Sequence, residues 1–341
     1  MAGNLVQQQR EEQRLDQKAA SRKRDEKWTY QTLTELHETD PSVKDGLAKN
    51  KAAAWRRSFV VALQRAGMAL KIPQWGIGMA MTLCHRFFSR KSMKVNDRVI
   101  IATACLHLAA KMEECPKPIR DVVKEMIRVK CKDPVEVARL TQPEELEKSK
   151  EEALMAERLV LYTLGFDLSL NHPYRFLVSH LSELKLLQVS NDASNPLKHL
   201  MQNTWNLVND SFRTQLCLQF KPEKIAASAL YLSNLISISK DSNGDVMKRV
   251  EQHHRAQYEQ QRTVFSQDMQ MARNTGCSTP LDLSPYQPPT FFSYFDVTLE
   301  EVDEISAQIM DMYLDIKLAS TLMAEELKAL QNTAGSGQVL Q

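Results

Sequence analysis

The stretch Val99-Ile-Ile-Ala-Thr-Ala-Cys-Leu-His-Leu-Ala-Ala110 contains no charged residue and is rich in alanine. A helix without a polar face is surrounded by protein on nearly all sides. Its small residues let neighbouring helices approach closely, at the short end of the usual range of about 8–10 Å between axes. The stretch therefore predicts the central helix of a bundle.

A second stretch of the same kind runs from Pro222 to Ile236. A shift of 124 positions superimposes the two, so that Ile101, Ala102, Leu106 and Leu108 fall on Ile225, Ala226, Leu230 and Leu232. Chance similarity between two buried helices would also give this match. We favour internal repetition of a whole helical domain, with each stretch at the centre of its own bundle.

The sequence around the first stretch predicts further helices. Apolar residues recur at helical spacing from Ala54 to Leu70, and a second helix follows from Gln74 to about Arg90. A short helix is expected near residues 119–129, a polar connection over about 130–148, and a helix over 151–164 that ends at the left-handed cap Gly165. A closing helix is expected over about residues 299–314.

Composition agrees with an all-α protein, because only 10 of 341 residues are glycine. The formal net charge of +2 argues against a protein that mainly binds the phosphate backbone of nucleic acid. No run approaches about 18 apolar residues, and the N-terminal residues have no apolar signal-peptide core. We therefore expect no membrane span and a location in the cytoplasm or nucleus.

Metal and catalytic motifs are not evident. None of the six cysteines forms a Cys-x-x-Cys pair, and several lie in apolar helical runs, which indicates buried free thiols. The adjacent His253 and His254 lack the spacing of zinc ligands. We expect no metal, no cofactor and no catalytic residue.

The expected organisation is two tandem helical bundles with N- and C-terminal helical arms. The first bundle is placed at residues 28–170 and the second at 171–238 and 289–315, with a polar insertion at 239–288. Residues 1–27 form a polar arm and 316–341 a C-terminal helix and tail. Within the arm, residues 18–24 are either a nuclear import signal or a solvated charged face.

Several motifs resemble those of the cyclin family, in particular the transcriptional cyclins. Those similar to a first cyclin box are His85-Arg-Phe-Phe88, Leu108-Ala-Ala-Lys-Met-Glu-Glu114, Leu164-Gly-Phe-Asp-Leu168 and His172-Pro-Tyr174. Those similar to a second box are Trp205-Asn-Leu-Val-Asn-Asp-Ser211, Arg213-Thr214, Leu218-Gln-Phe-Lys-Pro222 and Phe295-Asp-Val-Thr298. The chain resembles cyclin T of the plant type, with cyclins K and L as near relatives.

The resemblance implies a regulatory subunit and not an enzyme. Such a subunit binds and activates a cyclin-dependent kinase of the transcription-elongation type as a heterodimer in the nucleus. RNA polymerase II, through its C-terminal repeat domain, would be the substrate of the complex. The alternatives are a splicing-linked regulator of the cyclin K or L type, a DNA-binding basal transcription factor with paired cyclin-like folds, and a scaffold that has lost its kinase.

The resemblance also assigns kinase-binding residues. Lys111 and Glu157 are the polar pair, and the residues around them are Met112, Glu114, Leu161, Phe166 and Leu168. The alternative for the polar pair is a local ion pair that joins two helices, and for the apolar residues it is plain core. The second box has Leu235 where the first has Lys111, so only the first box is expected to bind kinase. Trp55-Arg-Arg-Ser-Phe59 replaces the Met-Arg-x-Ile-Leu docking patch of cell-cycle cyclins, so that substrate-docking role is not expected.

Overall fold

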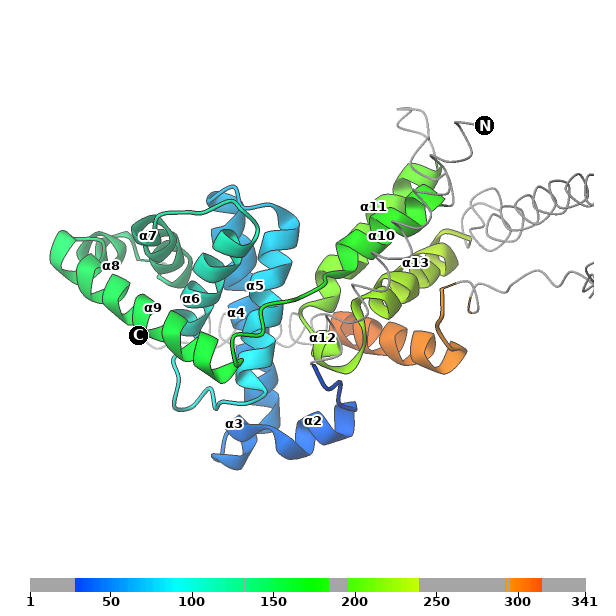
Figure 1. The fold of residues 1–341 in the computed structure, drawn as a ribbon, viewed down its shortest axis with the longest axis horizontal. Coiled ribbons are helices and arrows are strands. Elements are labelled where there is room, and N and C mark those ends of the chain that lie inside the picture. The colour runs from blue at the N-terminus through cyan, green and yellow to red at the C-terminus, as the bar shows by residue number, and fades with distance from the viewer. Residues whose placement is uncertain (1–27, 132, 184–195, 239–291, 293–294, 315–341) are drawn as a thin grey trace, which may run out of the picture. The chain divides into compact units, whose positions relative to one another are not determined.

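The computed structural model describes residues 28–131, 133–183, 196–238, 292 and 295–314. These residues form α-helices joined by turns and loops, with no strand among them, which confirms the all-α class (Figure 1). The polar arm with residues 18–24, the 239–288 insertion and the 316–341 tail all lie outside the described residues.

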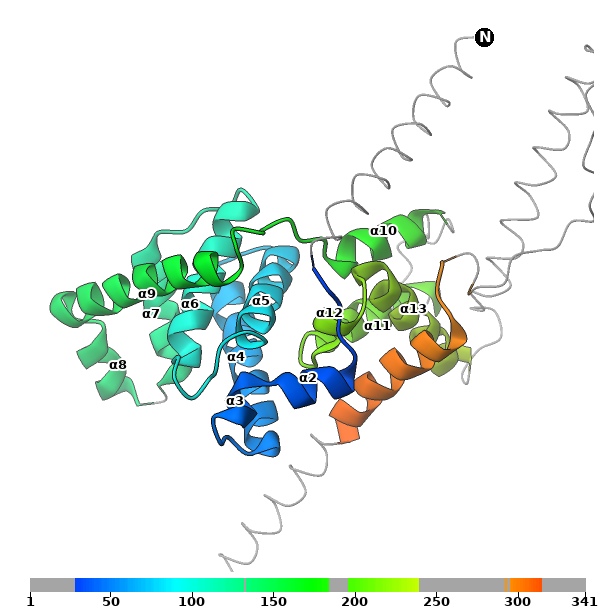
Figure 2. The ribbon, with the colours of Figure 1, turned by 60° about the horizontal axis from the view of Figure 1, so that its bottom comes forward.

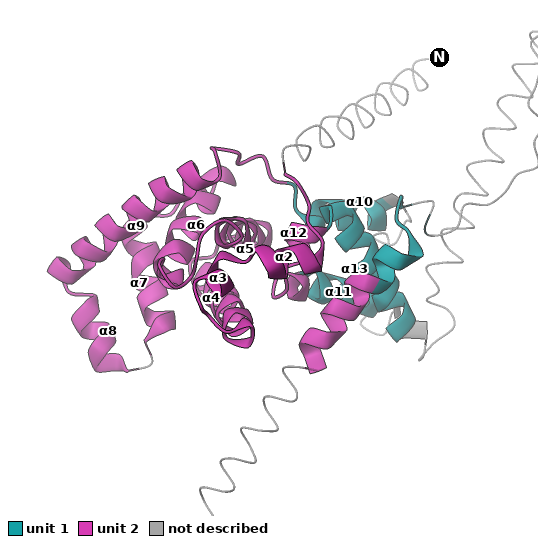
Figure 3. Cartoon of the chain, turned by 90° about the horizontal axis from the view of Figure 1, so that it is seen from below, with its two compact units in different colours: residues 1–26, 171–208, 220–303 teal, residues 27–170, 209–219, 304–341 magenta. Residues whose placement is uncertain are grey.

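The chain divides into two compact units, shown in different colours in Figure 3. We call them the α6 unit (Lys27–Leu170, Asn209–Gln219 and Glu304–Gln341) and the α13 unit (Met1–Glu26, Asn171–Val208 and Phe220–Asp303). The first nine helices among the described residues are α2 (Leu33–Thr39), α3 (Pro41–Lys44), α4 (Lys49–Ala69), α5 (Gln74–Phe88), α6 (Arg98–Met112), α7 (Ile119–Lys130), α8 (Pro134–Leu140), α9 (Pro143–Thr163) and α10 (Pro173–Glu183). They are followed by α11 (Pro196–Ser211), α12 (Leu216–Gln219), α13 (Pro222–Ile238) and a last described helix over residues 299–314.

Helix α6 is the centre of its unit. It packs against α4, α5, α7 and α9, which surround it in Figure 2. Residues 101–106 and 108–110 are buried, as the uncharged sequence predicts. Asp97 caps the helix, because its side chain accepts hydrogen bonds from the backbone N–H groups of Val99 and Ile100.

Gly67 on α4 allows a close approach by Ile77 on α5. A Cβ atom at residue 67 would lie 2.5 Å from Cγ1 and 2.7 Å from Cδ1 of Ile77. We expect Gly67→Ala to lower the free energy of unfolding by about 1 kcal/mol, because overpacking outweighs the gain in helix propensity. Urea unfolding measures the change. The cost should shrink in an Ile77→Ala background, which removes both close carbons, and an equal cost in both backgrounds would contradict the steric explanation.

The polar connection expected over residues 130–148 is wrong. That segment contains α8, which Asp133 caps through the N–H of Val135, and the first turn of α9. The start of α9 is rich in charged residues, which form exposed ion pairs at i, i+3 spacing, such as Lys148–Glu145. Its sequence therefore shows no apolar stripe. It is fixed instead by tertiary packing of Leu146 against Val123 of α7.

Helix α13 is buried at the positions that the repeat matches to α6. All four positions matched by the 124-residue shift, namely Ile225, Ala226, Leu230 and Leu232, are buried, as are their counterparts on α6. Helix α13 packs against α10, and Ser233 donates a hydrogen bond to the Leu200 carbonyl of α11 at 3.0 Å. The predicted burial of both stretches is therefore confirmed.

Candidate functional site

The structure brings together three polar side chains on α6 and α9, two adjacent helices of the α6 unit. Lys111 lies in the last turn of α6, and His107 lies one turn earlier. Both contact the carboxylate of Glu157 on α9: Oε1 accepts from Lys111 Nζ, and Oε2 lies 2.7 Å from His107 Nδ1. Sequence reasoning missed His107 because it stands within the uncharged stretch and was assigned to the buried helix.

The cluster is open to solvent on one side only. The side chain of Lys111 is 41% exposed, whereas those of Glu157 and His107 are each 12% exposed. Burial raises the pKa of Glu157, but the hydrogen bonds from Lys111 and His107 outweigh it and hold the pKa below its ordinary value of 4.5. Glu157 is therefore a fixed carboxylate at neutral pH, and Lys111 is the exposed end of the cluster.

The local ion pair that the sequence left open is formed in the structure. One of the three ammonium N–H groups of Lys111 is used by Glu157, which leaves two donors on a side chain that is 41% exposed. The ion pair also orients the long lysine side chain at the C-terminal end of α6, where a cation suits the helix dipole. The Lys111–Glu157 pair thus joins α6 to α9, and its lysine is the exposed partner.

Phe166 projects from the end of α9. Gly165 and Phe166 both have positive φ angles, +63° and +57°, and the Phe166 N–H donates to the Leu161 carbonyl at 2.9 Å. This is the Schellman arrangement that ends a helix, so the predicted left-handed cap at Gly165 is confirmed. The cap leaves Phe166 61% exposed.

The other apolar candidates are less exposed than Phe166. Met112, Leu161 and Leu168 are each only partly buried. They are therefore neither fully buried core residues nor fully exposed side chains.

Tyr162 is a further exposed aromatic residue that sequence reasoning missed. Its ring is 74% exposed and meets Phe166 edge to face, with centroids 5.6 Å apart and planes at 85°. Its spacing of four residues before Phe166, beside the helix cap, is a signal that could have identified it. Two large aromatic rings at one helix end form an exposed apolar patch of the kind found in protein–protein interfaces.

Glu114 ends α6 in a strained conformation. Its φ angle is +54°, and the N–H of Cys115 donates to the Ala110 carbonyl at 3.0 Å, so Glu114 occupies a position that glycine favours. We expect Glu114→Gly to raise the free energy of unfolding by about 0.5–1 kcal/mol.

Lys71 provides the matched control for Glu114. It ends α4 in the same motif with φ +53° and lies outside the candidate site. Lys71→Gly should give the same stabilisation in urea unfolding. If Glu114 contacts a kinase, only Glu114→Gly should also weaken kinase binding in a titration, and an equal affinity for both variants would remove Glu114 from the site.

The α13 unit carries no cation at the matching position. Leu235, which corresponds to Lys111, is 49% exposed at the end of α13. The charged cluster is therefore not repeated there.

The described residues show neither a metal-binding cluster nor a membrane-spanning helix. The five cysteines within the described ranges are free thiols, and only Cys84 and Cys105 are fully buried, whereas Cys115, Cys131 and Cys217 are partly exposed. Over these same ranges no group of three or more His, Cys, Asp or Glu side chains could hold a metal ion. No helix within the described ranges has the length and apolar character needed to cross a bilayer.

Comparison with known proteins gives consistent matches. Residues 27–169 match the family model of the cyclin N-terminal domain. Cyclin-T1-3 of Oryza sativa subsp. japonica is 43% identical over 220 residues, which are 63% of this chain and 43% of the relative. Cyclin-T1-5 of Arabidopsis thaliana is 42% identical over 213 residues, which are 62% of this chain and 35% of the relative. The chain thus spans less than half the length of these two relatives.

Two solved structures share the fold. The yeast RNA polymerase II CTD kinase CTDK-1 complex matches with a TM-score of 0.56 and 14% identity, over 83% of this chain and 72% of that chain. The CAK complex from Chaetomium thermophilum matches with a TM-score of 0.50 and 15% identity, over 84% and 86%. At these identities the likeness concerns the fold alone.

The decisive relative is a putative cyclin-T1-1 of Arabidopsis thaliana. It is 35% identical over 218 residues, which cover 63% of this chain and 83% of the relative. Together with the matched family model and the all-α fold, this relative shows that the chain belongs to the cyclin family, in its plant-type cyclin T group.

Proposed function

We propose that this chain is the regulatory subunit of a cyclin-dependent kinase of the transcription-elongation type. In this proposal it binds the kinase as a heterodimer in the nucleus and promotes phosphorylation of the C-terminal repeat domain of RNA polymerase II. It performs no bond chemistry itself. Residues 28–170 form the kinase-binding cyclin box, and residues 171–238 with 289–315 form the second box.

The observation that carries this proposal is the surface formed by the ends of α6 and α9. It combines the exposed Lys111 ammonium, held by Glu157, with the exposed ring of Phe166. Met112, Glu114, Leu161 and Leu168 complete the surface in the proposal. A cation and a carboxylate beside an exposed aromatic ring can hold polar groups of a partner while the ring enters an apolar pocket of that partner.

Activation follows if this surface binds the active kinase more tightly than the inactive one. A ligand changes a conformational equilibrium only through its different affinities for the two states. A preference of roughly 10⁴-fold, about 5.5 kcal/mol, moves an equilibrium from 1:99 to 99:1. Completion of the kinase's Lys–Glu pair and ordering of its activation loop are the conformational steps that such binding favours.

The proposal is tested by mixing the purified chain with candidate transcriptional kinases. We expect one of them to phosphorylate a heptad-repeat polymerase peptide much faster in the presence of this chain. A kinase-dependent pull-down would then identify the partner and distinguish a cyclin T role from a cyclin K or L role. If no transcriptional kinase is activated, the proposed function is wrong, and tight binding to promoter DNA would favour the basal transcription factor.

A further inference from the structure

The outer face of α4, in the α6 unit, is a basic surface. Residues 46–96, which include the whole of α4 and α5, contain ten lysine or arginine residues and no aspartate or glutamate. Residues that recur along α4 at spacings of four, three, four and three share one face of the helix, namely Lys51, Trp55, Ser58, Ala62 and Arg65. We call this face, together with Arg98 at the start of α6, the α4 ridge.

Trp55 holds two cations of the α4 ridge in place. Over its ring, Lys51 Nζ lies 5.4 Å and Arg98 Cζ lies 4.6 Å from the centroid, within the range of cation–π contacts. Arg98 Nε also donates a hydrogen bond to the Ser58 hydroxyl oxygen at 3.0 Å. The ring and the hydroxyl group therefore orient the Arg98 guanidinium and leave its two terminal nitrogens for another acceptor.

The donors of the α4 ridge can be reached from solvent. Lys51 and Arg65 are exposed, and Arg98 is half-buried. Both terminal nitrogens of Arg98 keep accessible surface and make no hydrogen bond among the described residues. A guanidinium that is fixed through Nε and open at its terminal nitrogens presents a fork that matches the two oxygens of a carboxylate.

None of the three cations of the α4 ridge forms an ion pair within the described part of the chain. Nearby carboxylates are engaged by other groups: Asp40 by Arg56, Glu125 of α7 by Arg128, and Asp97 by the N–H groups at the start of α6. Asp45 and Asp121 are exposed and form no ion pair with the α4 ridge. The fold therefore supplies no anion to these three cations.

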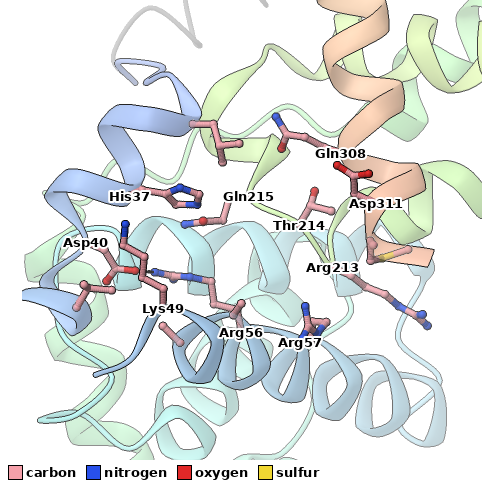
Figure 4. A pocket seen from close by; sticks show the side chains of 15 residues that line it. His37, Asp40, Lys49, Arg56, Arg57, Arg213, Thr214, Gln215, Gln308 and Asp311 are labelled. Atoms are coloured by element: carbon pink, nitrogen blue, oxygen red, sulfur yellow. Dashed lines mark hydrogen bonds and ion pairs between the residues drawn. The ribbon is translucent and has the colours of Figure 1, made fainter. Parts of the chain in front are cut away.

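The other flank of α4 carries charges of both signs. Figure 4 shows Arg56 of α4 beside Asp40 at a cavity of about 330 Å³, whose wall also carries Asp311. The side chain of Arg56 is only 5% exposed, and Asp40 balances its charge. The charge of a single sign that a partner can reach is thus found on the α4 ridge and not at the cavity.

The arrangement of the α4 ridge favours the carboxylates of a peptide over a nucleic acid. Lys51 and Arg98 already lie over the ring of Trp55, so this ring is not free to stack on a base, as aromatic rings do in single-strand binding. Lys51 and Arg65 are 14 positions apart on α4, a rise of about 21 Å, which an extended peptide of about six residues spans. The small side chains of Ser58 and Ala62 between them leave room for its backbone.

We propose that the α4 ridge binds an extended segment rich in aspartate and glutamate from a partner protein. One carboxylate pairs with both terminal nitrogens of Arg98, and others pair with Lys51 and Arg65 toward the two ends of the segment. The α4 ridge shares no residue with the proposed kinase contact, and its binding needs no kinase. Its failure and the failure of the proposed function are therefore distinguishable.

The experiment titrates the full chain into two fluorescent peptides of equal length, one made of Glu, Gly and Ser and one with Gln in place of every Glu. Fluorescence anisotropy gives the two affinities. We expect the Glu peptide to bind at least about tenfold more tightly, since charge-assisted hydrogen bonds reach such an effect. Its affinity should fall as salt is added, because exposed charges are screened. Equal affinities for the two peptides would overturn the proposal, as would tighter binding of an oligouridylate of the same net charge.

A double variant, Lys51→Gln with Arg65→Gln, should lose most of the preference for the Glu peptide. The matched control is Lys130→Gln with Lys198→Gln, which removes the same charge from exposed lysines of α7 and α11 and should keep the preference. Equal losses in the two double variants would show that net charge alone attracts the peptide, and would overturn the proposal.

Arg98→Lys tests the fork, because it keeps the charge but removes the two terminal nitrogens that act together. It should bind the Glu peptide more weakly than the unmodified chain, and unchanged binding would overturn the contact assigned to Arg98. Circular dichroism checks that each variant is folded. Because Lys51 and Arg65 are exposed, their double variant tests the surface even if Arg98→Lys disturbs the packing around Trp55.

Discussion

Lys111→Glu is expected to weaken kinase binding by about thirtyfold or more. Loss of one partner of a hydrogen-bonded charge pair in a protein interface costs about 2–5 kcal/mol, and each 1.4 kcal/mol is a factor of ten in affinity. The free protein should be affected far less, because the lysine is 41% exposed and exposed pairs contribute about 1 kcal/mol or less. A kinase titration by calorimetry gives the affinity, and circular dichroism with a melting curve gives the fold.

The internal ion pair makes a second variant necessary. Lys111→Glu places two carboxylates near each other, and that of Glu157 is only 12% exposed. Combining it with Glu157→Lys restores opposite charges within the chain but presents them to the partner in reversed order. If the pair serves the kinase interface, the double variant should recover the stability that repulsion removes in Lys111→Glu, apart from the bond between His107 and Glu157, and still fail to bind kinase.

The opposite outcome would assign the pair to the fold. In that case Lys111→Glu would lose helical content and thermal midpoint, and the charge-swapped variant would recover both stability and kinase binding. Lys130→Glu is the matched control, because it reverses an exposed lysine at the end of α7, outside the candidate surface. It should leave both the affinity and the melting curve unchanged.

The parts of the fold that could be predicted are those where local sequence and tertiary packing agree. Helix α6 is uncharged along nearly its whole length, so burial on all sides follows from its composition. The last described helix, residues 299–314, also falls where its sequence predicts it. The start of α9 was missed because most of its residues are charged, and the contact of Leu146 with Val123 that fixes it is long-range. Helix α8 was missed because its seven residues are too few to show a helical repeat of apolar positions.

The candidate site shows the same division between local and long-range information. The sequence indicates that Lys111 leaves the central helix at its end and that Gly165 caps α9. It cannot show that Glu157 accepts from His107 as well as Lys111, because that contact joins residues 50 positions apart. It also cannot show the positive φ of Glu114, since a non-glycine residue there contradicts the local preference.

The pH dependence of stability should be governed by a buried histidine. Burial, together with the nearby charge of Arg56, lowers the pKa of His85 from 6.5 to about 4, although the hydrogen bond to the Phe212 carbonyl acts in the opposite direction. The ring lies 2.8 Å from that carbonyl oxygen through Nε2 and meets Phe59 edge to face. It is therefore an uncharged imidazole that donates a hydrogen bond within the core.

The sign of the effect follows from the two pKa values. Between pH 6.5 and about 4 the unfolded chain binds a proton at His85 and the folded chain does not, so stability falls as the pH falls through this window. At pH 5 the loss from this residue is about 2 kcal/mol. Burial and the nearby charge of Arg175 also lower the pKa of His172 from 6.5 to about 4. This residue therefore adds a loss of stability of the same sign. Carboxylates with lowered pKa values, such as Glu157, lose their contribution only below about 4.5.

Urea unfolding at pH 7 and pH 5 measures this dependence. His85→Gln keeps an N–H donor for the Phe212 carbonyl but cannot titrate, so the difference between the two pH values should shrink by about 2 kcal/mol. His199→Gln, at an exposed position on α11, should leave the difference unchanged. An unaltered pH difference in His85→Gln would show that the imidazole takes up its proton in the folded chain as readily as in the unfolded one.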